Sequence, residues 1–122
     1  MARILVVDDS AVHLAAYEQI LANKHQVTTA ADGKRALDLL QEQTYDLLIT
    51  DVIMPDVSGF ELIEHVRDSC ADLKIIAVTG AFFPGADSDE FLHVAQNQGA
   101  DEVLAKPFEP QQLAGAVDKL LT

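Results

Sequence analysis

The sequence predicts an α/β fold, a doubly wound five-stranded parallel sheet flanked by five helices, in one domain over residues 1–122. Short apolar runs without alternation recur along the chain, as expected of strands buried on both faces of a parallel sheet. Between these runs, apolar residues stand three and four positions apart, which is the spacing of an amphipathic helix. The two kinds of segment alternate and end on a helix, and this order predicts βαβ units with right-handed crossovers.

Five segments fit strands. Residues 4–7 read Ile-Leu-Val-Val, and residues 47–50 and 75–79 are similarly rich in Leu, Ile, Val and Thr. Residues 103–105 form a shorter run, and residues 26–30 form a weaker one that contains one valine and two threonines. β-Branched residues pack well on a pleated, buried surface. We therefore expect all five segments to join one sheet.

Helical spacing marks the segments that follow the strands. It predicts four helices through the sets Leu14, Tyr17 and Leu21; Leu37 and Leu40; Leu62 and Val66; and Leu113, Val117 and Leu120. A further helix, between the fourth and fifth strands, is indicated by Phe91 and Ala95, with Asp87 or Ser88 as its N-cap. Ser10 stands where it can cap the first helix. The predicted order is therefore strand–helix repeated five times.

The composition excludes several classes of protein. Twenty acidic against eight basic residues give a net charge of −12, which argues against direct binding of nucleic acid, because phosphate contacts need clustered Lys and Arg. Cys70 is the single cysteine, so no internal disulfide and no oxidising compartment is implied. The apolar run at the N-terminus ends at Asp8, too short for a signal peptide or a membrane span. We expect a cytoplasmic protein.

Polar side chains follow four of the predicted strands. They are Asp8 and Asp9, Asp51, Thr79 and Lys106. In an open parallel sheet the carboxyl ends of the strands meet at one edge, where ligands bind. A lone Asp could simply cap a helix, and for Asp8 that alternative stays open. Three carboxylates, a hydroxyl and an ammonium converging from four strand ends favour a binding or catalytic site.

The expected cluster of carboxylates needs a positive partner. Two like charges 4 Å apart repel by about 4 kcal/mol at an effective dielectric constant near 20. Either one carboxylate takes up a proton or a cation binds among them. Oxygen ligands suit Mg²⁺, or Mn²⁺ in its place, and the absence of His and Cys from these loops argues against zinc. Beside such a cation, Asp51 could attack phosphorus and form an acyl phosphate, while Lys106 neutralises the phosphoryl oxygens and Thr79 hydrogen-bonds one of them.

These motifs resemble the full signature of the response-regulator receiver family over essentially the whole chain. The matching residues are Asp8-Asp9, Asp51 with Met54-Pro55 and Gly59, Thr79-Gly80, and Lys106-Pro107-Phe108. The resemblance implies a flavodoxin-like sheet of strand order 2-1-3-4-5, with two helices on one face and three on the other. It also implies phosphotransfer from a histidine kinase or a histidine phosphotransfer protein. The implied protein is a monomer or a phosphorylation-dependent dimer that signals to a downstream protein partner.

The resemblance also implies a role for each site residue. Asp51 is the expected phosphoacceptor, Thr79 the switch hydroxyl and Lys106 the partner of the phosphoryl group. The expected metal ligands are Asp9, Asp51, the backbone carbonyl of Ile53 and, largely through water, Asp8. The four histidines, including His13, are expected to be ordinary surface or partly buried residues.

Two departures from the family pattern concern signal output. Val103 stands three residues before the lysine, where the family usually has Tyr or Phe. The stretch between Thr79 and Lys106 is longer than the family norm, through residues 80–89. Phe82 and Phe83 in that stretch could cover the edge of the core or dock a partner. We expect the usual coupling to an aromatic residue to differ here, but not the phosphorylation chemistry.

Two other functions fit the same fold class. A phosphohydrolase with an aspartyl-phosphate intermediate also uses a parallel sheet and Mg²⁺, but its nucleophile follows the first strand in an Asp-x-Asp arrangement, whereas this chain has adjacent Asp8 and Asp9. The other is a receiver fold that binds partners without phosphorylation, against which the complete set Asp9, Asp51, Thr79 and Lys106 argues. A nucleotide-binding Rossmann protein is excluded, because no glycine-rich loop follows the first strand. No output domain is expected after the last helix.

Overall fold

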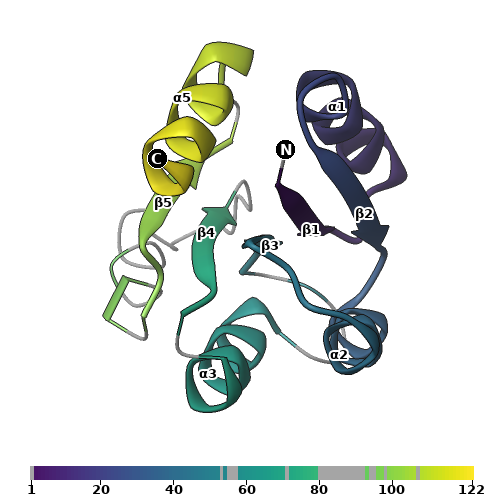
Figure 1. The fold of residues 1–122 in the computed structure, drawn as a ribbon, viewed down its shortest axis with the longest axis vertical. Coiled ribbons are helices and arrows are strands. Elements are labelled where there is room, and N and C mark those ends of the chain that lie inside the picture. The colour runs from purple at the N-terminus through teal and green to yellow at the C-terminus, as the bar shows by residue number, and fades with distance from the viewer. Residues whose placement is uncertain are drawn as a thin grey trace, which may run out of the picture.

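A computed structural model describes residues 2–52, 54, 58–70, 72–79, 93, 96–97, 99–106 and 108–122. Its five strands are β1 (Arg3–Val7), β2 (Gln26–Ala30), β3 (Leu47–Asp51), β4 (Lys74–Thr79) and β5 (Glu102–Ala105). They form one parallel sheet in the order β2-β1-β3-β4-β5 (Figure 1). The predicted strand positions and strand order are confirmed.

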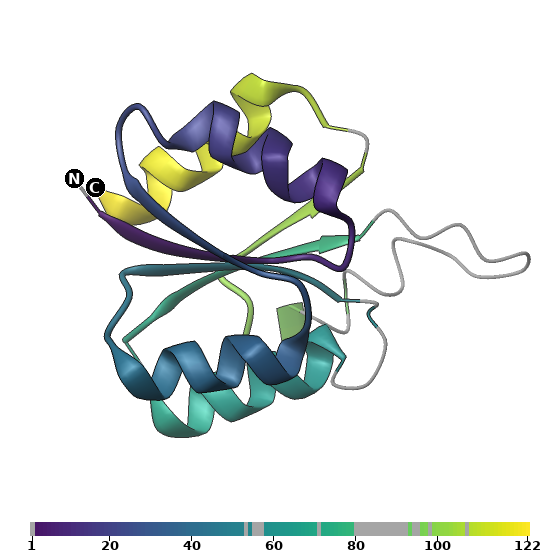
Figure 2. The same cartoon turned by 90° about the vertical axis from the view of Figure 1, so that its right-hand side faces the viewer.

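Among the described residues, four helices of ten residues or more cover the two faces of this sheet. They are α1 (Ala11–Leu21), α2 (Gly33–Glu42), α3 (Gly59–Ser69) and α5 (Pro110–Leu121). Figure 2 shows α1 and α5 on one face and α2 and α3 on the other. Each layer has its own core: Tyr17, Leu113 and Val117 pack on the first face, and Ala36, Leu62 and Ile63 on the second. In the part of the chain that the structure describes, no helix is both long and apolar enough to cross a bilayer.

The predicted helix between β4 and β5 lies mostly outside the described residues. Of its expected residues, Phe91, Ala95, Asp87 and Ser88 are not described, whereas His93, Gln96 and Asn97 are described as helical.

In α2 the buried stripe is formed by Gly33, Ala36 and Leu39. Leu37 and Leu40, from which the sequence predicts this helix, pack at its edge and are partly buried.

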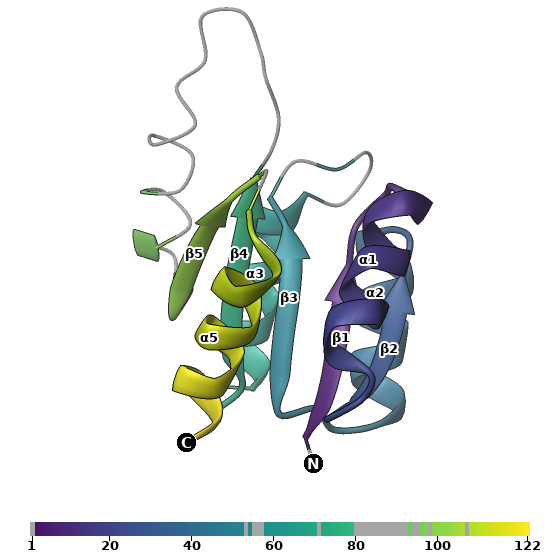
Figure 3. The same ribbon diagram turned by 90° about the horizontal axis from the view of Figure 1, so that it is seen from above.

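The strand register brings the ends of the strands to one edge of the sheet. Val7 pairs with Thr50, and the next residue of β3, Asp51, pairs with Val78. Thr79 in turn pairs with Ala105, directly before Lys106. Figure 3 shows the strand arrowheads directed toward the same edge. Asp8, Asp51, Thr79 and Lys106, which stand at or directly after the ends of β1, β3, β4 and β5, therefore lie at this edge.

A guanidinium group at the opposite edge fixes the entry into β5. Arg67 of α3 donates hydrogen bonds to the carbonyl oxygens of Gly99 (2.8 Å) and Leu73 (2.7 Å) and to the Asp101 carboxylate (2.5 Å). The same carboxylate oxygen of Asp101 accepts the backbone N–H of Ile75 at 2.8 Å. Gly99 has φ 123°, and a Cβ atom there would lie 2.7 Å from the Arg67 side chain. This set of contacts, here called the Arg67 clasp, ties α3, β4 and the start of β5 together.

Candidate functional site

Three carboxylates gather at the carboxyl edge of the sheet. Asp8 and Asp9 follow β1, and Asp51 is the last residue of β3. One carboxylate oxygen of each lies within 4.8 Å of the other two. Asp8 and Asp51 are buried, with 1% and 7% of their surface exposed, whereas Asp9 is exposed. The structure thus brings together the three acidic side chains that the sequence predicts to be metal ligands.

The donor set fits a small, hard divalent cation. Mg²⁺ takes oxygen ligands at about 2.1 Å. The three carboxylate oxygens, all within 4.8 Å of one another, lie close enough together to converge on a single such ion. All three donors are oxygens, as Mg²⁺ and Mn²⁺ prefer. The fourth predicted ligand, the carbonyl of Ile53, lies outside the described residues.

Lys106 carries the positive charge among these carboxylates. Its Nζ atom lies 2.5 Å from Asp8 Oδ2 and 3.2 Å from Asp51 Oδ2, and only 12% of its side chain is exposed. The backbone N–H of Lys106 donates to the carbonyl of Thr79 at 2.7 Å, which fixes the origin of the side chain beside β4. Since the ammonium already contacts two carboxylates, it offsets part of their mutual repulsion.

The sequence leaves open whether Asp8 only caps a helix or belongs to the charged site, and its contacts distinguish these two roles. Its Oδ1 atom accepts the backbone N–H of Ser10 at 2.9 Å, and its Oδ2 atom pairs with Lys106. The N-cap of α1 is Ser10, whose hydroxyl accepts the backbone N–H of His13, as predicted. Asp8 is therefore part of the charged site, and helix capping is not its sole role.

Two hydroxyl groups near this edge are buried, and no described residue supplies them with a hydrogen-bond partner. Thr79 at the end of β4 is 1% exposed, and neither its Oγ1 atom nor the phenol oxygen of Tyr17 has a partner among the described residues. Buried polar groups in folded proteins are normally hydrogen-bonded. The Thr79 hydroxyl stands at the strand end beside Lys106, where an oxygen-bearing ligand at the carboxylates could supply its partner.

Tyr17 was predicted only as a position on the buried stripe of α1. The structure places its ring against Phe108, with the two ring centroids 5.9 Å apart and the planes tilted by 36°. Burial raises the pKa of Tyr17 far above its ordinary value, and the negative charges of Asp8 and Asp51 raise it further. The phenol is therefore neutral at physiological pH. Helical periodicity shows that Tyr17 is buried but not that it lies within reach of the charged site.

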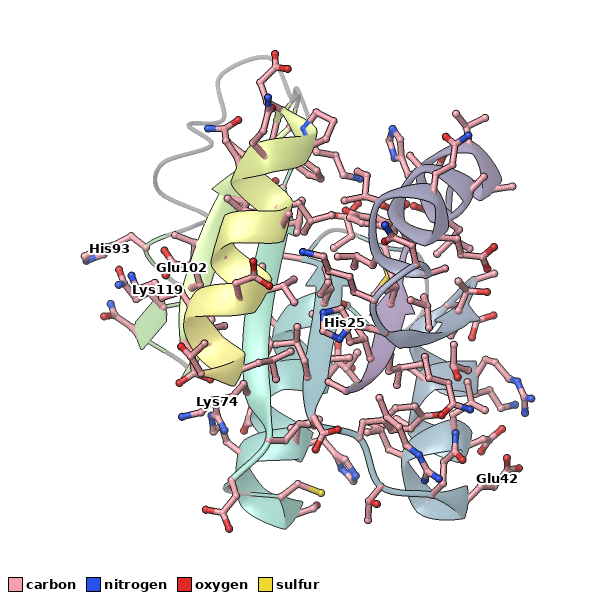
Figure 4. All side chains as sticks on the ribbon, turned by 45° about the horizontal axis from the view of Figure 1, so that its top comes forward. His25, Glu42, Lys74, His93, Glu102 and Lys119 are labelled. Carbon is pink, nitrogen blue, oxygen red and sulfur yellow. The ribbon has the colours of Figure 1, made fainter. Side chains whose placement is uncertain are left out.

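His13 is a residue of the site that the sequence analysis misses. It lies in the first turn of α1, with its Nδ1 atom 2.9 Å from Lys106 Nζ and 3.4 Å from Asp8 Oδ2. Its side chain is 48% exposed, so the imidazole lies at the rim of the site. Its place follows from the packing of the first turn of α1 beside Lys106, which no spacing within the sequence predicts. By contrast, Figure 4 shows His25 and His93 apart from each other, and His25 accepts the backbone N–H of Ala2 at 3.2 Å.

The N-terminus of α3 packs directly against the backbone of Asp51. The N–H of Gly59 donates to the carbonyl of Val52 at 3.1 Å, and Ser58 caps the helix. A Cβ atom at Gly59 would lie 2.1 Å from the carbonyl oxygen of Asp51, a distance that no side-chain rotation could relieve. Glycine at position 59 therefore permits the close approach that sets the position of Asp51.

Val103 occupies β5 three residues before Lys106. It is partly buried and packs against the core on the α2 and α3 face. The stretch 80–89, which the sequence analysis connects with signal output, lies outside the described residues. Among the described residues, the ring of Tyr17 stacks against that of Phe108 on the opposite face of the sheet.

Replacing Asp9 with alanine should weaken Mg²⁺ binding at least about tenfold, because it removes an anionic ligand from a site with few ligands. Asp9 is exposed, so the change leaves no buried cavity and reduces the repulsion on Asp8 and Asp51. Calorimetric titration measures the affinity, and thermal melts in EDTA measure the stability. Asp38→Ala on the exposed side of α2 removes the same charge elsewhere and serves as the control. Unchanged Mg²⁺ affinity, or a marked loss of metal-free stability, would contradict this prediction.

The sequence is similar to that of a known protein family. The family model described as response regulator receiver domain matches residues 4–118. The chain is 32% identical over 120 residues to the two-component response regulator ORR3 of Oryza sativa subsp. indica, covering 97% of this chain and 89% of that protein. It is 35% identical to the response regulator MprA of Mycolicibacterium vanbaalenii, covering 98% of this chain but only 50% of MprA.

Solved structures show the same fold. The BeF3-activated DrrB receiver domain superposes with a TM-score of 0.88 at 29% identity, over 99% of this chain and 97% of that one. The chemotaxis response regulator CheY4 of Vibrio cholerae superposes with a TM-score of 0.86 at 32% identity, over 98% of each chain. These similarities cover the strands and helices that carry all the described site residues.

Proposed function

The chain belongs to the response regulator receiver family, and on that premise we propose that it is a signalling switch in which Asp51 accepts a phosphoryl group. One observation supports this most directly. Asp8, Asp9 and Asp51 lie within 4.8 Å of one another at the edge where Lys106 also contacts Asp8 and Asp51. Three clustered carboxylates, two of which contact one ammonium, form a site suited to a divalent cation and a phosphoryl group.

The proposed reaction transfers a phosphoryl group to a carboxylate oxygen. An oxygen of Asp51 attacks phosphorus, the bond from phosphorus to the donor nitrogen or oxygen breaks, and the donor leaves with that electron pair and gains a proton. A divalent cation held by Asp8, Asp9 and Asp51, with the predicted Ile53 carbonyl, supplies charge neutralisation when bound. Lys106 donates to a phosphoryl oxygen, and the buried Thr79 hydroxyl hydrogen-bonds another.

The proposed donor is a histidine kinase or a histidine phosphotransfer protein, and the phosphorylated form changes its binding to a downstream protein. We place this reaction in the cytoplasm, in a monomer or a phosphorylation-dependent dimer. The net charge of −12 gives no support to direct binding of nucleic acid. The receiver family is one of signalling domains, and the proposed chemistry is confined to the domain's own phosphorylation and dephosphorylation.

Incubation with acetyl phosphate and Mg²⁺ should raise the intact mass of the protein by one phosphoryl group. Asp51→Asn keeps the shape of the side chain but removes the nucleophilic carboxylate, so the mass increase should disappear, as it should when EDTA removes the metal. Asp38→Asn, an exposed change on α2, should label like the wild type. Labelling that persists in Asp51→Asn would overturn the assignment of the acceptor. An unlabelled wild type would favour a receiver fold that acts without phosphorylation.

A further inference from the structure

We propose that His13 is a positioning residue for the transfer to Asp51. Its Nδ1 atom accepts a hydrogen bond from the Lys106 ammonium and, together with Asp8, directs a third N–H bond of that group toward Asp51. This inference rests on the function proposed above and adds a residue to its site. The residue comes from the first turn of α1, 93 positions from Lys106 in the sequence.

The first step is the set of acceptors around Lys106. Its Nζ atom lies 2.5 Å from Asp8 Oδ2, 2.9 Å from His13 Nδ1 and 3.2 Å from Asp51 Oδ2. An ammonium group has three N–H donors and no acceptor. Asp8, His13 and Asp51 therefore supply one acceptor for each donor. The longest of the three contacts is the one to Asp51, the carboxylate that the proposed reaction modifies.

The second step concerns which atom donates in the contact to His13. The Nδ1 atom is also 3.4 Å from Asp8 Oδ2, a pairing in which the imidazole would have to donate. The contact to Lys106 is shorter, 2.9 Å, and an ammonium can only donate. We therefore assign Nδ1 as the acceptor in the contact with Lys106.

The third step is the mechanical consequence. Lysine carries a point charge on a flexible four-carbon stem, so its position depends on the groups that hold it. Without His13, the ammonium would keep only two of these contacts. They are the short contact to Asp8 and the longer contact to Asp51. The ammonium could then rotate about Asp8, and its third N–H bond would point toward Asp51 for less of the time. Misplacing a group that stabilises developing charge slows the reaction.

The position of His13 makes this role testable apart from folding. Its side chain is 48% exposed and makes no contribution to either hydrophobic core. In His13→Asn, the amide Oδ1 atom occupies nearly the same place as Nδ1 of the imidazole and can accept the same hydrogen bond. His13→Ala removes the acceptor. Val12→Ala changes a neighbouring residue that is 78% exposed and serves as the matched control.

The experiment measures the rate at which phosphoramidate labels the protein at saturating Mg²⁺, followed by intact mass. His13→Ala should label about tenfold more slowly or worse, as expected for losing one hydrogen bond to a charged group. His13→Asn should recover most of the wild-type rate, and Val12→Ala should keep it. Melting temperature and Mg²⁺ affinity should be the same in all four proteins.

A second readout follows the ammonium itself. In protein labelled with [¹⁵N]lysine, the Nζ resonance of Lys106 should shift in His13→Ala and return in His13→Asn, whereas that of Lys119 should not move. Equal labelling rates in wild type and His13→Ala, or an Asn variant as slow as the Ala variant, would overturn the role of His13 while leaving Asp51 as the acceptor. A wild type that takes no phosphoryl group would overturn both.

Discussion

Lys106→Met should destabilise the metal-free protein by about 3 kcal/mol, the scale of breaking a buried ion pair by removing one partner. The reason is the isolation of Asp8, which is 1% exposed and would lose the ammonium 2.5 Å away. Methionine keeps the length of the lysine stem, so the change tests the charge more than the packing. Asp51, whose side chain is 10% exposed, loses the same partner.

Added Mg²⁺ should stabilise Lys106→Met more than the wild type. In the wild type the ammonium already neutralises part of the negative charge of two of the carboxylates that would hold the cation, so those carboxylates attract the ion less strongly. A ligand that binds only the folded state stabilises it in proportion to RT ln(1 + [L]/Kd), so tighter binding gives the larger increment. Urea unfolding in EDTA and in excess Mg²⁺ measures both quantities.

The control for this change is Lys119→Met. Lys119 pairs with Glu102 at 3.1 Å, but 72% of its side chain is exposed, and such surface pairs contribute little. The free energy of unfolding of Lys119→Met should stay close to that of the wild type with and without Mg²⁺. Equal destabilisation by the two substitutions, or equal Mg²⁺ increments in Lys106→Met and wild type, would show that the ammonium does not act as the internal counter-charge of the site.

Gly59→Ala and Gly115→Ala should change stability in opposite directions. The Cβ atom of an alanine at 59 would lie 2.1 Å from the Asp51 carbonyl oxygen and 2.4 Å from the Cα atom of Val52. Only a shift of backbone can relieve these contacts, and we expect a loss of about 3 kcal/mol or more. Gly115 lies in α5, and beyond its chain neighbours and the backbone of its own helix no described atom lies within 4 Å of the added Cβ, so alanine there should stabilise by about 0.5–1 kcal/mol.

The same two substitutions distinguish an effect on the position of Asp51 from an effect on the stability of the fold. Because the clash at Gly59 falls on the residue that carries the proposed acceptor, any Gly59→Ala protein that still folds should be labelled slowly by acetyl phosphate. Gly115→Ala should be labelled at the wild-type rate. Urea unfolding followed by circular dichroism gives the stabilities. Wild-type stability and labelling in Gly59→Ala would refute the close approach of α3 to Asp51.

The sequence predicts the sheet well because its strands are runs of buried β-branched and aliphatic residues, such as 47–50 and 75–79. It also predicts that Asp8, Asp51, Thr79 and Lys106 converge, since parallel strands share one carboxyl edge. Helical periodicity gives less information about which residues of other elements a side chain lies near. It places Tyr17 on the buried face of α1 but does not show that its phenol lies near the charged residues.

His13 illustrates the same limit. Its place at the rim follows from where the first turn of α1 lies relative to Lys106 after β5. These two segments are 93 residues apart in the chain, and the strand that precedes α1, β1, is not adjacent to β5 in the sheet. No local pattern in the sequence encodes that distance. The prediction that the histidines are ordinary surface residues describes the exposure of His13 but misses its contacts with Lys106 and Asp8.

The Arg67 clasp has a consequence for how this chain can vary in evolution. Residue 99 is held by Arg67, and residue 79 is held where its carbonyl accepts the N–H of Lys106 at 2.7 Å. Thr79 is the last residue of β4 and Gly99 is held by Arg67 of α3, so contacts among described residues fix both ends of the segment between them. Closing a longer connection between fixed ends costs little, about 0.6 kcal/mol for each doubling of its length. Insertions between positions 79 and 99 can therefore diversify this stretch while selection keeps the charged edge unchanged.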